Sequence, residues 1–352
     1  MTVRIAGIQQ IGIGVPDVHN AWTWYRQNFA LDVPIFEEAA EANLMLPYTD
    51  GKAHNRHAIL AISMQGGGGF EIWQYTSRTP QMPDFKIQLG DLGIYYPKIK
   101  CRDVVRKHQE LLKNGIELIS EVVMDPAGSK CFGVKDPYDN IFQIVDFDSW
   151  FSHTGQLTGG VCGIMIGVSD IDRSLKLYRD ILGYDTVVFD KTGHFPDLTG
   201  LPGGDHEFRR VLLRHSAERV GAFSQLLGPS EIELISSINR TPRRIFENRL
   251  WGDRGFIHLC FDVVDMAELK KQCEAHGFPF TVDSSQSFDM GEAAGHFTYI
   301  EDPDGTLIEF VETHKIPILK KLGWYLNLKK RNQEKPLPRW ILKTLSLNRK
   351  RN

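Results

Sequence analysis

Alternating apolar and polar positions form a short strand pattern that returns along the chain. The segment QIGIGVPD at 10–17 has the two-residue period of a strand. It runs into VHNAWTWYRQNF, where apolar residues recur every three to four positions as in an amphipathic helix. GIMIGVSD at 163–170 and HLCFDVVD at 258–265 also precede helical patterns, and YPKIKCRD at 96–103 is the weakest copy. The pattern predicts four strand–helix units.

The ends of these units repeat as well. FEIWQYTSRTP at 70–80 matches IELISSINRTP at 232–242, and DPYDNIFQIVDF at 136–147 matches DPDGTLIEFVET at 302–313. Each unit therefore contains a strand, a helix and then several strands, which predicts an α+β fold of four βαβββ modules. The expected ranges are 1–80, 85–150, 158–242 and 250–315, followed by a tail at 316–352.

Glu309 is a carboxylate in the middle of an apolar strand. In the sequence TLIEFV, Leu307 and Val311 share the face of Glu309, and the opposite face is apolar too. A buried charge is costly unless it is paired or binds a metal ion. The strand therefore predicts a partner for Glu309.

Composition places the chain among ordinary globular proteins. It has 352 residues, of which 42% are hydrophobic and 24% charged. The five cysteines show no CxxC pair, which favours a reducing compartment. We find no signal peptide and no apolar run long enough to span a bilayer, so we expect a cytoplasmic protein.

Charge is distributed unevenly along the chain. The net charge is −3, but the residues from Lys315 onward carry about +11 and the body about −14. No nucleic-acid-binding groove is expected in the acidic body. The tail pattern predicts a basic amphipathic helix, which would pack on the protein's own body, contact a second subunit or lie on an anionic membrane surface.

The repeats resemble the βαβββ modules of the vicinal oxygen chelate superfamily, which includes glyoxalase I, bleomycin-resistance proteins and extradiol dioxygenases. The resemblance covers residues 1 to about 315, and RGFIHLCFDVVD (254–265) and DPDGTLIEF (302–310) are most similar to glyoxalase I. It implies that pairs of modules form two cupped eight-stranded half-barrels, each able to surround one divalent metal ion.

The resemblance also implies where the metal ligands lie. Each module of that family offers one ligand from its first strand and one from its last. In chain order, the corresponding residues are Gln10 and Glu71, Tyr96 and Gln143, Gly163 and Glu233, and His258 and Glu309. If the first module pairs with the fourth, the set becomes the Gln/Glu/His/Glu set of one glyoxalase I type. The second and third modules would then enclose a degenerate cavity. We follow this interpretation, with pairing of neighbouring modules as the alternative.

The implied activity is that of a divalent-metal-dependent, glyoxalase-like lyase or isomerase. Its substrate would chelate one nickel, cobalt, zinc, manganese or iron ion through two adjacent oxygens. Glu309, or alternatively Glu71, would move the proton.

Three further residues are candidates for substrate binding: Arg254, Tyr299 and His296. Arg254 matches a glutathione-contacting arginine of glyoxalase I. The chain has Gly14 and Tyr75 where that family has two other glutathione contacts, so another small molecule with vicinal oxygens is as plausible as a glutathione adduct.

Two alternatives stay open. An Fe(II) extradiol-type dioxygenase is suggested by His296 and Tyr299 before Glu309, although Gly163 stands where its first histidine would be. A non-catalytic binding protein of the bleomycin-resistance type would keep the fold without the metal.

Overall fold

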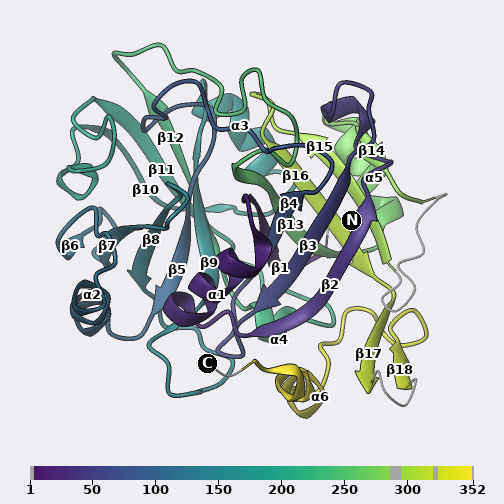
Figure 1. The fold of residues 1–352 in the computed structure, drawn as a ribbon. Helices are drawn as coiled ribbons and strands as arrows, with labels where there is room; N and C mark the ends of the chain where they lie inside the picture. The colour runs from purple at the N-terminus through teal and green to yellow at the C-terminus, as the bar shows by residue number, and fades with distance from the viewer. Residues whose placement is uncertain (1–3, 286–294, 320–323, 351–352) are drawn as a thin grey trace.

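The structure of the chain is a computed structural model that describes residues 4–285, 295–319 and 324–350. Figure 1 shows two curved sheets side by side, with helix α1 between them. Each repeat supplies one strand, one helix and three further strands, so the four βαβββ units and the two eight-stranded sheets confirm the predicted α+β fold.

The first and fourth repeats form one sheet, here called the 1+4 sheet. Its strand order is β14-β15-β16-β13-β1-β4-β3-β2, and β1 pairs antiparallel with β13 at its centre. The strands are β1 (Arg4–Gly14), β2 (Val33–Glu41), β3 (Asn55–Ile62), β4 (Gly69–Tyr75), β13 (Gly255–Val264), β14 (Val282–Asp283), β15 (Gly295–Glu301) and β16 (Leu307–Thr313).

The second and third repeats form the 2+3 sheet in the same way. Its order is β10-β11-β12-β9-β5-β8-β7-β6, with β5 antiparallel to β9 at the centre. The strands are β5 (Gly93–Cys101), β6 (Val123–Met124), β7 (Lys130–Lys135), β8 (Ile141–Asp146), β9 (Thr158–Gly167), β10 (Thr186–Gly193), β11 (Phe208–Arg214) and β12 (Glu231–Ser237). The outer modules therefore pair with each other. The alternative centre, built from the third and fourth modules, is not formed because β9 and β13 lie in different sheets.

The aspartate that closes each repeated strand caps the following helix. The side chains of Asp17, Asp103, Asp170 and Asp265 each accept a hydrogen bond from the backbone N–H three residues later. The helices of the described chain are α1 (Val18–Phe29), α2 (Val104–Lys113), α3 (Ile171–Tyr178), α4 (Ser224–Leu227), α5 (Met266–Ala275) and α6 (Arg339–Thr344).

Two buried tyrosines connect the sheets. Tyr25 of α1 donates to Asp136 Oδ2 at 2.6 Å, and Tyr178 of α3 donates to Asp302 Oδ2 at 3.0 Å. Each aspartate begins the turn before the last strand of the module in the opposite sheet. The apolar core between the sheets surrounds these bonds and includes Phe70 and Phe142.

The tail differs from the predicted amphipathic helix. β17 (Lys315–Leu319) and β18 (Trp324–Asn327) form an antiparallel hairpin, while residues 320–323 lie outside the described part of the chain. Packing explains the difference, because the hairpin buries Ile316 and packs Leu326 against the apolar cluster around Val33. The helical end of the described tail consists of α6 and the 3₁₀ helix Leu345–Asn348 that follows it, so a helical C-terminal segment is confirmed.

The rest of the tail packs on the body of the protein. Leu337 and Leu342, each 1% exposed, join an apolar cluster with Val33 of β2. Ion pairs reinforce the contact, as between Arg349 Nη2 and Asp32 Oδ2 at 2.6 Å. In the described residues we find no helix with the length and apolar character that crossing a bilayer requires. Contact of the tail with a membrane or a second subunit stays a prediction.

Candidate metal centre

Four side chains converge on one point at the concave face of the 1+4 sheet. His258 Nε2 lies 3.1 Å from Glu309 Oε2 and 3.3 Å from Glu71 Oε2. The amide Nε2 of Gln10 lies 3.3 Å from the same oxygen of Glu71 and 3.4 Å from that of Glu309. The structure therefore brings together all four side chains that the sequence suggested as ligands.

The register of the sheet places these residues. Glu71 on β4 lies beside Gly12 on β1, and Glu309 on β16 lies beside Cys260 on β13. Gly12 in turn pairs with His258 across the antiparallel centre. Because side chains two residues apart share a face, the four strands direct one ligand each to the same side of the sheet. The first and fourth modules thus contribute two ligand side chains each, from equivalent strands of the repeat.

Gly12 leaves the space that the imidazole of His258 occupies. A Cβ atom at this position would lie 2.8 Å from His258 Nε2 and closer still to Cε1. Such a contact would push the ring out of the centre, since His258 is fully buried and its surroundings are packed.

Replacing Gly12 by alanine should therefore weaken metal binding by at least about tenfold, the usual scale for disturbing a ligand's support. The measurement is competition for zinc against a chromophoric chelator. Ile11→Val, on the same strand but in the core between the sheets, is the matched control and should bind as wild type does. Equal affinity of the Gly12→Ala protein would contradict the argument.

The donor set fits a divalent ion. Gln10 Oε1 and His258 Nε2 are buried atoms without a hydrogen-bond partner among the described residues. A half-turn of the Gln10 amide would direct Oε1 toward the carboxylates and imidazole. Ligands about 2.1 Å from one ion occupy adjacent octahedral positions about 3.0 Å apart, close to the 3.1 and 3.3 Å observed from His258 Nε2 to the two carboxylates.

The charges at the centre favour a cation. Burial opposes the charged form of His258, but Glu309 and Glu71 outweigh burial and raise the pKa of its imidazole to about 9. Without a metal ion, a proton on His258 would compensate part of the negative charge. Metal binding requires the neutral imidazole, so an ion and this proton compete for the same nitrogen.

This shift predicts a pH dependence for the metal-free protein. The raised pKa contributes stability that is complete below about 6.5 and is lost as the pH rises through about 9. A shift of this size corresponds to about 3 kcal/mol. Urea unfolding of the metal-free wild type and of His258→Gln should therefore show the wild type's advantage shrinking by about that amount between pH 6 and pH 10. An advantage that does not change with pH would refute the assignment.

Aromatic side chains surround His258. Tyr299 OH lies 3.3 Å from His258 Nδ1, and burial together with Glu309 raises the tyrosine pKa well above its usual value. With a metal ion on Nε2 the imidazole proton lies on Nδ1, so the neutral hydroxyl of Tyr299 can accept from it and hold the ring in place. Trp251 lies parallel to the imidazole, with ring centroids 6.4 Å apart. Trp251 could not be predicted as a neighbour of His258, because it lies in a loop without a periodic sequence pattern.

The other two predicted substrate contacts lie elsewhere. His296 pairs with Asp283 at 2.7 Å and stands three residues from Tyr299 on β15, so it faces the opposite side of the sheet. Arg254 precedes β13 and lies near Tyr138, in the turn before β8 of the other sheet. The described contacts of His296 and Arg254 do not include the four ligand residues. A role of these two residues in substrate binding stays a prediction.

The corresponding point of the 2+3 sheet is filled by cationic side chains. Lys98 Nζ lies 2.7 Å from Glu231 Oε1 and 2.9 Å from Glu233 Oε2, and Arg210 Nη2 lies 2.6 Å from Glu233 Oε1. Lys98 and Arg210 are each 1% exposed. Burial alone would raise the pKa of Glu233, but Arg210 and Lys98 hold it below its usual value. In this half-barrel, Lys98 and Arg210 thus supply the positive charge that balances the buried carboxylates.

Gly163 makes this arrangement possible. It occupies the position of Gln10 in the repeat and pairs with Lys98 across the sheet. A Cβ atom here would lie 2.7 Å from Glu231 Cγ and 3.2 Å from Lys98 Cδ. Gly163 has no side chain that could act as a ligand, and Lys98 was not predicted from the sequence. The sequence does contain a signal for this ion pair, since Lys98 alternates with apolar residues in one strand and Glu231 with apolar residues in another.

Comparisons with known proteins agree with this architecture. Residues 160–310 match the family model described as Glyoxalase/Bleomycin resistance protein/Dioxygenase superfamily. A glyoxalase I mutant from Zea mays has 14% identity and a TM-score of 0.56, over 87% of this chain and 93% of that one. A putative dioxygenase from Bacillus subtilis subsp. subtilis str. 168 has 12% identity and a TM-score of 0.58, over 88% and 86%. No curated protein sequence matches the chain. These structures share the fold, and the family-model match over residues 160–310 agrees with the superfamily expected from the sequence.

Proposed function

We propose that the chain, whose residues 160–310 match the Glyoxalase/Bleomycin resistance protein/Dioxygenase superfamily model, is a divalent-metal-dependent lyase or isomerase of the glyoxalase type. The observation that carries the proposal is the convergence of Glu71, His258 and Glu309, whose ligand atoms all lie within 4.8 Å of one another. Gln10 completes the set with an amide whose buried oxygen has no partner among the described residues.

Gln10, Glu71, His258 and Glu309 would hold one ion of nickel, cobalt, zinc, manganese or iron. When bound, the ion would supply Lewis-acid stabilisation of the negative charge that develops on two adjacent substrate oxygens. The substrate class that suits this chemistry is a small molecule with an α-hydroxy carbonyl group or its thiol adduct.

The side chains around the centre would then orient the substrate and move its proton. Glu309 is the first candidate for the base, with Glu71 the other. The side chain of Glu71 is 13% exposed and that of Glu309 is 8% exposed. Tyr299 would keep His258 in place. The indole Nε1–H of Trp251 is buried without a described acceptor, so it can donate to a substrate oxygen.

The first test is the metal content of the protein expressed with mixed divalent metals, beside His258→Ala. We expect the variant to lose one equivalent of ion. The loaded protein is then incubated in D2O with α-hydroxy ketones and thiol hemithioacetals, and NMR follows deuterium entering the carbon next to the carbonyl.

Exchange that requires His258 would support the proposal. Tightly bound iron together with oxygen consumption would point to a dioxygenase instead. Equal metal content in both proteins and no exchange would leave a binding protein that does not transform its ligand.

A further inference from the structure

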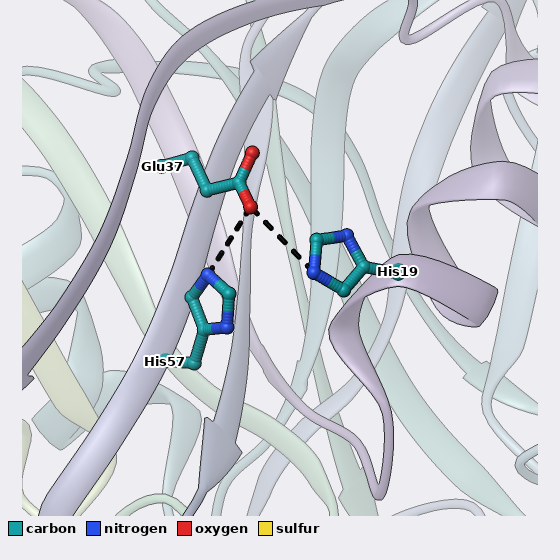
Figure 2. A group of neighbouring side chains, drawn as sticks. All are labelled: His19, Glu37 and His57. Carbon is teal, nitrogen blue, oxygen red and sulfur yellow. Dashed lines mark ion pairs between the residues drawn. The ribbon is translucent and has the colours of Figure 1, made fainter.

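A second group of side chains of the types that bind metals, here called the outer group, lies at the edge of the 1+4 sheet, on the face that α1 covers. Figure 2 shows His19, Glu37 and His57 pointing toward one another from three different elements. The Oε1 atom of Glu37 lies 3.5 Å from His19 Nε2 and 3.3 Å from His57 Nε2. One ligand atom from each residue can be chosen so that all three lie within 4.8 Å of one another.

These three side chains are held by one helix and two paired strands, α1, β2 and β3. Glu37 on β2 pairs with Ile59 on β3, and His57 pairs with Ala39, so Glu37 and His57 are diagonal neighbours on one face. Ile59 belongs to the core beneath α1, which identifies this face as the one that the helix covers. His19 is the second residue of α1 and reaches the same point from above. The two imidazole rings lie 5.2 Å apart and nearly perpendicular.

The group is separate from the central cluster. Glu71 and Trp73 occupy the concave side of the sheet, whereas the residues between them, Phe70 and Ile72, pack in the core on the side of α1. The outer group therefore lies across the thickness of the sheet from the proposed catalytic centre, and it shares no residue with that centre.

The charged partners described for the carboxylate of Glu37 are the two histidines. Both ion pairs described for Glu37 are with His19 and His57. Arg56, next to His57 in sequence, pairs instead with Glu38 at 3.0 Å, on the opposite face. The side chains of His19 and Glu37 are 59% and 44% exposed, so water can complete the coordination of an ion.

We propose that His19, Glu37 and His57 form a second divalent metal site. Two imidazole nitrogens and one carboxylate oxygen suit zinc, copper or nickel, whereas magnesium and calcium prefer oxygen ligands throughout. A bound ion would join the first turn of α1 to the β2–β3 hairpin at the edge of the sheet. The site does not depend on the proposed catalytic function.

The test counts zinc in the full-length protein after removal of metal with a chelator. Equilibrium dialysis at micromolar free zinc is followed by elemental analysis of wild type, His57→Ala and the matched control His54→Ala. His54 lies on the same hairpin but outside the cluster, near Ser77. We expect His57→Ala to bind one zinc fewer than wild type and His54→Ala to bind the same number. Glu37→Gln should weaken the site about tenfold or more.

The same comparison in a His258→Ala background separates the two sites. His57→Ala should again remove one equivalent, and zinc should raise the melting temperature only where His57 is present. Circular dichroism of the metal-free variants checks that they fold. Unchanged zinc in His57→Ala would overturn the proposal, and so would an equal loss in His54→Ala, which would indicate nonspecific binding to surface histidines.

Discussion

Replacing Glu309 by glutamine is expected to lower turnover by about 10²- to 10⁴-fold, the usual contribution of a positioned acid or base. The amide keeps an oxygen that can stay at the centre, but it cannot accept the substrate proton. The loss should appear in kcat, with a smaller change in KM, because substrate binding through the two oxygens does not need the base.

The measurement is deuterium exchange into substrate, with metal content determined on the same sample. Gln143→Met is the matched control, because Gln143 holds the equivalent position in the 2+3 sheet and should leave turnover unchanged. Glu71→Gln decides between the two carboxylates, since the larger loss identifies the base. If the Glu309→Gln protein retains both its metal ion and full turnover, Glu309 is not the base.

Replacing Lys98 by methionine is expected to have the largest effect on stability, about 3–5 kcal/mol. Lys98 is 1% exposed and contacts both Glu231 and Glu233. Removing its ammonium would leave buried carboxylates with less compensation than their desolvation requires. Urea unfolding of the metal-free proteins measures the difference.

The double variant Lys98→Met with Glu231→Gln is the control for this experiment. It removes one positive and one negative charge together, while Arg210 still pairs with Glu233. We expect it to recover most of the lost stability, because replacing both partners of a buried pair costs far less than removing one. If the single and double variants are equally unstable, packing of the lysine stem is responsible and the charge argument is wrong.

Local patterns explain why the repeats and the four converging residues could be predicted. Asp17 and Asp265 end a strand and begin a helix through side-chain caps that depend on neighbouring residues alone. Positions such as Glu71 and Glu309 follow from strand alternation once the repeats are aligned. The pairing of outer modules could be chosen only from the chemistry of the resulting donor set, and the observed sheet order agrees with that choice.

Long-range packing explains what could not be predicted. β13 contains a bulge, since Gly12 and Ile13 pair with His258 and Phe256 and leave Ile257 unmatched. Simple alternation from His258 therefore fails toward the start of the strand, so the sequence alone could not give the faces of the residues there. Trp251 reaches His258 from a loop, and a loop's course depends on the whole fold.

Gly163 and Lys98 together make a metal centre in the 2+3 sheet difficult to acquire by single substitutions. A metal-binding side chain placed at 163 would collide with Glu231 and Lys98. If Lys98 changed first, the carboxylates of Glu231 and Glu233 would be left with too little compensating charge. Either single step passes through a less stable protein, so a metal centre in the 2+3 sheet requires both changes together. New activity in this chain is therefore more accessible by altering the residues around His258 than by building a metal centre in the other half-barrel.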